Sequence, residues 1–187
     1  MIVNRGRNRL FLLLLFALFL LPYWAAIPLH AETAFPSRIS LLPNREYAEA
    51  LLQGIRNARS SIACSFYLFK TGEGRGNIPR RIAEELIRAR HRGIAVTVIL
   101  EKSSVPTDPL NDDNRNTASL LVRGGVMVRF DSPGTTSHSK VVVIDKRHVY
   151  LGSHNLTQAA LLHNNELSAH IDSPEIAEQA LSFLETE

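Results

Sequence analysis

The chain has 187 residues, 45% of them hydrophobic and 21% charged, which is the composition of a globular domain with a buried core. Its single cysteine, Cys64, excludes an intramolecular disulfide and hence a disulfide-stabilised scaffold. The net charge of +3 arises from the first 31 residues, which hold three of the 21 basic residues and no acid; the remainder is formally neutral, so its charge does not indicate a nucleic-acid partner.

The N-terminal segment has the pattern of a secretory signal. Three arginines within the first nine residues form a basic start, residues 10–21 are apolar, and small residues lead up to Ala31. This apolar run is shorter than the roughly 20 residues that a membrane span needs, which favours a signal cleaved after Ala31. Counted on through residue 27, the same run predicts instead an uncleaved anchor over residues 10–27. We therefore expect a signal peptide or anchor over residues 1–31 and an exported domain, periplasmic or secreted, over residues 32–187.

The rest of the chain alternates between helical and strand patterns. Apolar side chains at helical spacing predict helices over residues 44–59, 78–92, 115–123 and 156–162 and from Ser173 to the C-terminus. Short apolar or β-branched runs predict strands over residues 61–69, 94–100, 126–130, 139–144, 148–151 and 166–171. Asn44 is the expected cap of the first helix, and a polar loop is expected over residues 101–114. The alternation predicts the α/β class, as a single domain with a mixed β-sheet flanked by helices.

Polar side chains stand at both ends of the strand pair predicted over residues 139–151. His138 and Lys140 are two residues apart and share one face at the strand entrance, whereas Ser153 and Asn155 follow the returning strand. The hairpin brings these four side chains to one end. An imidazole can attack phosphorus or donate a proton near neutral pH, while ammonium, hydroxyl and amide groups can bind phosphoryl oxygens. The sequence therefore predicts phosphodiester chemistry that uses no metal.

The pattern His138-x-Lys140-x4-Asp145-x6-Gly152-Ser153-x-Asn155 resembles the HKD motif of the phospholipase D superfamily. The segments around it, among them "SSIACSFYLF", "RGIAVTVIL" and "LLVRGGVMVRF", are similar to those of the single-motif bacterial endonuclease branch. The resemblance implies the phospholipase D/nuclease-like fold for residues 32–187.

The resemblance also implies how the site works. Members of this family with one motif per chain form a homodimer on a two-fold axis and share one active site. One His138 would then form a phosphohistidine and the other would protonate the leaving group. Lys140 and Asn155 would bind the non-bridging oxygens with Ser153 in support, and Glu166 would orient the His138 of the partner subunit. Asp145, also part of the motif, is expected to fix local structure.

The remaining histidines do not indicate a metal site. The spacings of His148, His154, His163 and His170 fit no common ligand motif, and core or surface positions are expected for them. His154 differs because it lies inside the motif, where it is a candidate substrate-binding residue. No metal and no other cofactor is expected.

The substrate class stays open between nucleic acid and phospholipid. Residues 75–92 hold six arginines and two glutamates, which indicates either a track for a nucleic-acid backbone or a helix face with paired charges. The small size and the polar 101–114 loop favour a nonspecific nuclease over a phospholipase D that releases a lipid headgroup. A third alternative is an inactive phosphate-binding or membrane-anchored scaffold, against which the intact motif argues. A membrane partner is expected only if the N-terminal segment stays uncleaved.

Overall fold

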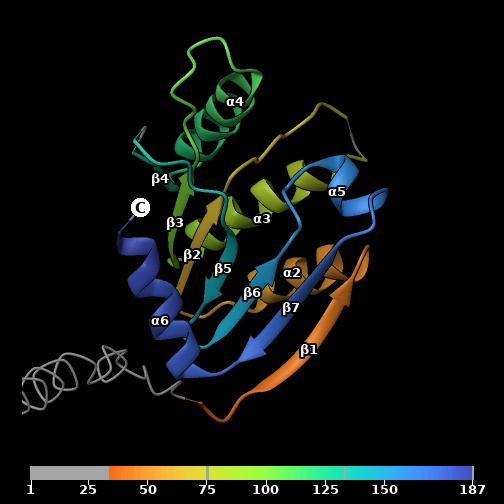
Figure 1. Ribbon diagram of the computed structural model, residues 1–187, viewed down its shortest axis with the longest axis vertical. Helices are drawn as coiled ribbons and strands as arrows, with labels where there is room; N and C mark the ends of the chain where they lie inside the picture. The colour runs from red at the N-terminus through yellow and green to blue at the C-terminus, as the bar shows by residue number, and fades with distance from the viewer. Residues whose placement is uncertain (1–33, 75, 133, 187) are drawn as a thin grey trace, which may run out of the picture. The chain divides into compact units, whose positions relative to one another are not determined.

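The computed structural model of the protein contains a seven-stranded sheet in the order β1-β7-β6-β5-β2-β3-β4 (Figure 1). The parallel pairs are β2 with β3 and β3 with β4, and the other four pairs are antiparallel. The strands are β1 Arg38–Pro43, β2 Ser61–Phe66, β3 Ala95–Leu100, β4 Met127–Phe130, β5 Lys140–Ile144, β6 His148–Gly152 and β7 Leu167–Asp172. The predicted mixed sheet and α/β class are confirmed.

The structure describes residues 34–186 apart from 75 and 133, and Phe35–Glu187 form one compact unit. The expected signal peptide or anchor over residues 1–31 lies outside the described residues. In the described part of the chain, no helix combines the length and the apolar character that a membrane crossing requires.

Helices cover both faces of the sheet (Figure 1). One face packs against a large core shared with α2 and α3, whose members include Leu51, Ile82 and Val142. The opposite face packs against α6 through a smaller core that contains Val143, Val149 and Leu184. The helices are α2 Glu46–Asn57, α3 Ile78–His91, α4 Pro109–Arg123, α5 Gln158–Leu162 and α6 Pro174–Glu185. The three-layer arrangement leaves the strand ends open to the surface.

Two elements differ from the sequence prediction. β1 was not predicted, because four of its six residues are exposed and an edge strand carries little of the apolar signal that marks a buried one. α4 begins six residues before the expected start at residue 115, since the Asp108 side chain accepts from the Leu110 N–H and Pro109 occupies the first turn. The polar 101–114 loop is accordingly shorter than expected.

Asn44 does not cap α2, contrary to the prediction. It has a left-handed backbone with φ of 49°, and the residue at the cap position is Arg45, which makes no side-chain cap bond. The Asn44 N–H donates to the carbonyl of Glu166 at 2.9 Å, and its Oδ1 accepts from the Glu166 N–H at 3.0 Å. Asn44 therefore ties the turn after β1 to the residue that precedes β7.

The face covered by α6 also carries exposed apolar side chains, which we call the leucine patch and define as Ile39, Leu41, Leu151 and Leu167. Strand pairing aligns Leu41 with Ala169 and Ala169 with Leu151, so the patch runs across β1, β7 and β6. Leu41 is 65% exposed and Leu167 is 54% exposed. Contiguous apolar surface of this kind marks interaction sites.

Candidate active site

Apart from Asp145, the predicted site residues lie at one end of the sheet, where β2 and β6 end and β5 and β7 begin. Lys140 pairs with Phe66 at the end of β2, and the Tyr67 N–H donates to the Ser139 carbonyl at 3.0 Å. The segment after β6 is held to the same place, because the Leu156 N–H donates to the Leu68 carbonyl at 3.0 Å. Three chain segments thus bring His138, Lys140 and Asn155 to the same end of the sheet, as predicted.

Lys140 is 8% exposed, and its ammonium group has two neighbours. Its Nζ donates to the His138 carbonyl at 2.7 Å and lies 5.2 Å from the centroid of the Tyr67 ring. Burial lowers the pKa of Lys140, and the nearby Glu166 carboxylate acts in the opposite direction. The ammonium group is therefore held in a fixed place by a carbonyl and an aromatic ring, with Glu166 close enough to stabilise its charge.

The His138 ring meets the Tyr67 ring edge-on, with their centroids 4.6 Å apart. Loss of contact with water lowers the pKa of His138, and the positive charge of Lys140 lowers it further. The imidazole is thereby kept neutral near pH 7, which is the form that acts as a nucleophile or a base.

Ser153 and Glu166 interact directly. The Ser153 hydroxyl donates to Glu166 Oε2 and accepts from the Leu167 N–H at 3.1 Å, and Asn164 Nδ2 donates to Glu166 Oε1 at 3.1 Å. Asn155 Oδ1 is buried and has no hydrogen-bond partner among the described residues. Ser153 thus serves to hold the Glu166 carboxylate.

Gly152 lets the backbone of β7 approach closely. A Cβ at this position would lie 2.4 Å from the Cα of Ser168 and 2.6 Å from the Leu167 carbonyl oxygen. The glycine is required because the β7 backbone passes directly against it.

The prediction that His154 contacts the substrate is wrong. Its side chain is fully buried, its ring stacks on Tyr47 with centroids 4.4 Å apart, and both of its ring nitrogens have partners. Nδ1 lies 2.7 Å from Ser168 Oγ and Nε2 lies 2.9 Å from the Asn44 carbonyl oxygen. His154 is therefore a buried structural residue between Ser153 and Asn155 and has no accessible surface that a substrate could contact.

Asp145 lies at the other end of β5 from Lys140 and cannot belong to the chemistry. Its Oδ1 accepts from the Ser60 N–H at 2.7 Å and the Ser61 N–H at 3.2 Å, and both oxygens accept from the Arg59 N–H at 3.0 Å. Burial alone would raise the pKa of Asp145, but these hydrogen bonds together lower it. The carboxylate fixes the turn before β2 to the β5–β6 hairpin, in agreement with its expected local role and against its grouping with the catalytic residues.

Replacing Asp145 by alanine is expected to lower the free energy of unfolding by about 1–3 kcal/mol, because three backbone donors lose their acceptor. The folded state holds a lowered pKa, so this stabilisation is present above the unfolded pKa of about 4 and is lost as the pH falls through the lower folded value. Urea denaturation at pH 7 and at pH 3 measures both effects. Asp112→Ala, which removes only an exposed ion pair with Arg115, is the matched control and should change little.

A hollow of about 440 Å³ lies beside His138. The 131–137 loop forms one wall, and the end of α6 contributes Phe183, which is 52% exposed. Glu101 is buried and its Oε2 accepts from the Ser137 N–H at 2.7 Å, so it positions the loop that leads to His138. Sequence reasoning missed Tyr67, Glu101 and Phe183. Only Tyr67 carried a usable signal, as an aromatic residue inside the strand predicted to reach residue 69.

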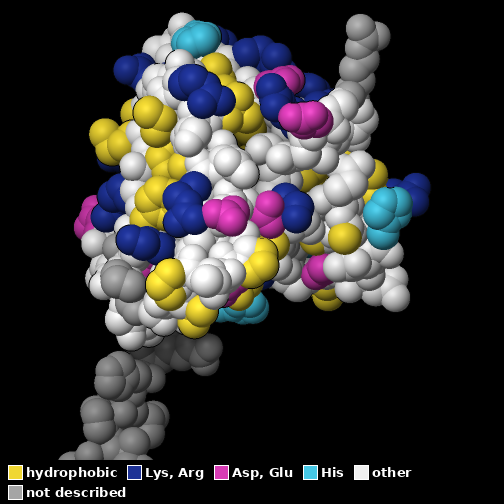
Figure 2. Space-filling view, turned by 90° about the horizontal axis from the view of Figure 1, so that it is seen from above, with side chains coloured by type: hydrophobic (Ala, Val, Ile, Leu, Met, Phe, Trp, Pro, Cys, Tyr) yellow, Lys and Arg dark blue, Asp and Glu magenta, His cyan; other side chains and the backbone are white. Residues whose placement is uncertain are grey.

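Two arginines of helix α3, Arg80 and Arg88, form ion pairs. Arg80 pairs with Glu84 at 3.3 Å, and Glu85 pairs with Arg88 and with Arg56 of α2. On the face seen in Figure 2, acidic side chains lie directly against basic ones. The paired helix face is therefore the better interpretation of residues 75–92.

Among residues 34–186 without 75 and 133, no three His, Cys, Asp or Glu side chains are grouped so that they could hold a metal ion. His148 and His170 lie in β6 and β7, away from His138, and His163 is exposed after α5.

Comparison with known proteins gives one family match. Residues 51–186 match the family model described as "Cardiolipin synthase, PLD-like domain". The phospholipase D of Rickettsia conorii is 33% identical over 100 residues, which are 54% of this chain and 47% of that protein. The 5′-3′ exonuclease PLD3 of Xenopus laevis is 31% identical over 127 residues, which are 63% of this chain and 25% of that protein. This chain thus spans about half or less of the length of these curated relatives.

A solved structure shares the fold over nearly its whole length. Nuc from Salmonella typhimurium, a phospholipase D family member, superimposes with a TM-score of 0.66 at 24% identity. The match covers 79% of this chain and 91% of that one.

Proposed function

The chain belongs to the phospholipase D superfamily, and from this membership we propose that it is a phosphodiesterase that cleaves nucleic acid through His138. The main support for this proposal is the arrangement of His138 and Lys140. The pKa of the His138 imidazole is lowered, in part by the nearby Lys140 ammonium group. The donors of the site are imidazole, ammonium and amide groups. Such a set suits a phosphoryl group directly, so the proposed mechanism needs no metal ion.

In the proposed mechanism a neutral His138 attacks phosphorus and the P–O bond to the leaving group breaks. The leaving oxygen takes a proton from His138 of the partner subunit. That histidine, now neutral, removes a proton from water as the water attacks phosphorus and breaks the P–N bond, which restores both imidazoles. Lys140 and Asn155 stabilise the charge that develops on the non-bridging oxygens.

The second His138 requires a second copy of the chain, and the leucine patch supports a homodimer. Leu167 directly follows Glu166, and Leu151 lies two residues before Ser153, so the exposed apolar surface is continuous with the site. A partner seated on this patch would bring its own His138 toward Glu166. The carboxylate could then accept from the ring N–H and orient that histidine.

Two observations favour nucleic acid as the substrate. The exposed Phe183 ring shares a hollow with His138, which is where a base next to the scissile phosphate could stack. The Xenopus laevis relative carries the name of an exonuclease. The ion pairs of Arg80 and Arg88 weaken the separate argument from a basic track.

The second candidate function is a phospholipase D that releases a lipid headgroup. The Rickettsia conorii relative carries that name, and the leucine patch offers apolar surface that could meet a membrane.

Incubation of the purified protein with a single-stranded oligonucleotide and with phosphatidylcholine vesicles, both in EDTA, tests the proposal. We expect the oligonucleotide to be cut and the vesicles to stay intact. Cleavage of the lipid alone would replace the nuclease by the phospholipase. Loss of all activity in EDTA, with return on adding a divalent metal, would contradict the metal-independent mechanism.

The pH dependence of kcat/KM should report the neutral His138. We expect activity to rise with pH through a pKa below the ordinary histidine value of 6.5, because loss of water contact and Lys140 both lower it. Lys140→Gln removes the second cause and should move this acid limb to higher pH, in addition to slowing the reaction. An acid limb that stays in place in Lys140→Gln would show that another group titrates.

We also propose that residues 1–31 direct export of the domain to the periplasm or outside the cell, on the pattern of their sequence. Comparing the N-terminus of the protein from the cell envelope with that of the full chain tests this, and cleavage after Ala31 is the expected result.

A further inference from the structure

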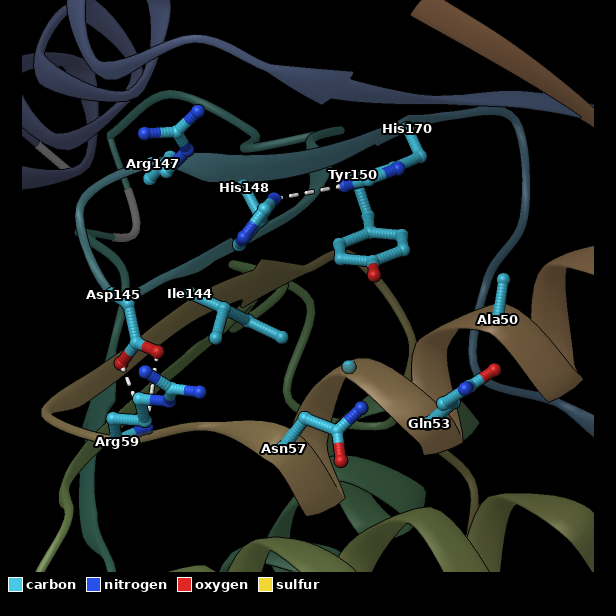
Figure 3. Close-up of a pocket in the computed structure, with 11 residues that line it drawn as sticks. Ala50, Gln53, Asn57, Arg59, Ile144, Asp145, Arg147, His148, Tyr150 and His170 are labelled. Carbon is cyan, nitrogen blue, oxygen red and sulfur yellow. Dashed lines mark hydrogen bonds between the residues drawn. The ribbon is translucent and has the colours of Figure 1, made fainter.

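A second hollow lies at the opposite end of β5 from His138 (Figure 3). Its volume is about 660 Å³, within the range of small-molecule sites. It lies between α2 and the sheet, at the end where the β5–β6 hairpin turns. Nothing in the proposed mechanism uses these residues, so the hollow needs an explanation of its own.

Hydrogen-bond donors dominate the polar part of the lining. α2 contributes the amides of Gln53 and Asn57, and Arg59 follows this helix at one end of the hollow (Figure 3). Two imidazoles stand on the sheet side, where His148 Nδ1 and His170 Nε2 lie 3.2 Å apart. Together these groups form a surface that suits an anion.

The acids near the hollow are already paired. The Asp145 carboxylate accepts from the backbone N–H groups of residues 59–61, and Asp172 Oδ1 accepts from Arg147 Nε at 2.5 Å. The guanidinium group of Arg59 makes no ion pair with any of the described residues. The Arg59 guanidinium at one end of the hollow therefore stays available to an anionic group, and the Asp145 carboxylate in the same lining is held by backbone N–H groups.

The floor of the hollow is apolar. Ile144 and Ala50 contribute aliphatic surface, and the Tyr150 ring stacks on His170 with centroids 4.6 Å apart. Gly54 allows this packing, since a Cβ there would lie 2.6 Å from the Tyr150 hydroxyl oxygen. A bare inorganic anion would leave the apolar floor uncovered, whereas an anion carried on a small organic group would contact both parts.

We propose that this hollow binds an organic phosphate monoester of about mononucleotide size, with the phosphate at Arg59 and the organic group over Tyr150 and Ile144. The guanidinium group binds phosphate with two parallel hydrogen bonds, and the His148–His170 pair supplies a further N–H. A transition metal at the two imidazoles is the competing occupant, but the positive charge of Arg59 disfavours a cation there.

The test follows the ring C–H signals of the histidines by NMR in the His138→Asn protein, which cannot turn over a ligand at the catalytic site. We expect adenosine monophosphate to shift the signals of His148 and His170 to saturation. Inorganic phosphate should shift the same signals at higher concentration, and uncharged adenosine should not shift them. Because the readout is separate from that of the catalytic site, this result does not depend on the proposed nuclease function.

Two variants locate the phosphate. Arg59→Gln keeps the backbone N–H that Asp145 accepts from, and Gln53→Glu adds a negative charge without a change of shape; each should weaken binding at least about tenfold. Arg81→Gln removes an equal charge from an exposed position on α3 and should leave binding unchanged. In a protein that keeps His138, Arg59→Gln should leave the rate of oligonucleotide hydrolysis at the native value.

Three outcomes would overturn the proposal: adenosine monophosphate that leaves His148 and His170 unshifted at millimolar concentration, adenosine that binds as tightly as its phosphate, or unchanged affinity in Arg59→Gln. Saturable binding of Zn²⁺ that is lost in His148→Gln, without any response to phosphate, would identify the hollow as a metal site instead.

Discussion

Replacing His138 by asparagine is expected to reduce phosphodiester hydrolysis by about 10³-fold or more, because the change removes both the nucleophile and the proton donor of a shared site. Asparagine keeps a similar size and a polar end, so Tyr67 should keep its packing. The measurement is the initial rate of oligonucleotide cleavage, alongside the thermal unfolding midpoint.

The exposed His163 provides the matched control, since it is a histidine outside the site. His163→Asn should retain the native rate. A His138→Asn protein that unfolds at the native temperature and still cleaves at the native rate would show that the nucleophile lies elsewhere.

Replacing Leu167 by aspartate is expected to convert the proposed dimer into monomers and to remove most activity. A charge in the centre of an apolar interface costs about 2 kcal/mol or more, which raises the dissociation constant by about 30-fold or more. The monomer would hold only one His138 and could not complete the two-step mechanism. Sedimentation or light scattering at several protein concentrations gives the mass, and the cleavage rate is followed in the same samples.

Met127 provides the control for Leu167, because it lies in an edge strand and is exposed to a similar extent, 63% against 54%. Met127→Asp should remain dimeric and active. If Leu167→Asp is monomeric and keeps the native specific activity, the shared-site mechanism is wrong even though the family membership stands.

The grouping of His138, Lys140 and Asn155 was predictable from sequence because these residues flank one hairpin. Strand periodicity places His138 and Lys140 on one face, and the turn at Asp145 returns the chain so that Asn155 joins them. The same periodicity explains why His154 could not be assigned. The residues on either side of His154 face the site. Whether His154 itself is exposed or buried depends on Tyr47 and Asn44, which lie more than a hundred residues away in the sequence.

Other features depended on contacts between distant segments. The ion pairs of α3 could be predicted where both partners lie on that helix, as for Arg80 and Glu84, but Glu85 also pairs with Arg56 of another helix. Asn44 has the residue type of a helix cap, yet its hydrogen bonds go to Glu166. In both cases the local pattern allowed a local partner and the tertiary fold supplied a different one.

The three hydrogen bonds of Asn44 have a consequence for any shortened or fused form of the protein. They connect β1, a strand at the edge of the sheet and outside the family match, to the backbone of Glu166 and to the ring of His154. Trimming the chain to the matched residues 51–186 would remove Asn44 and free both of these groups. Because the same cut removes β1 and the core residue Tyr47 of α2, loss of activity in such a truncated protein should not be taken as evidence that the HKD motif lacks catalytic power.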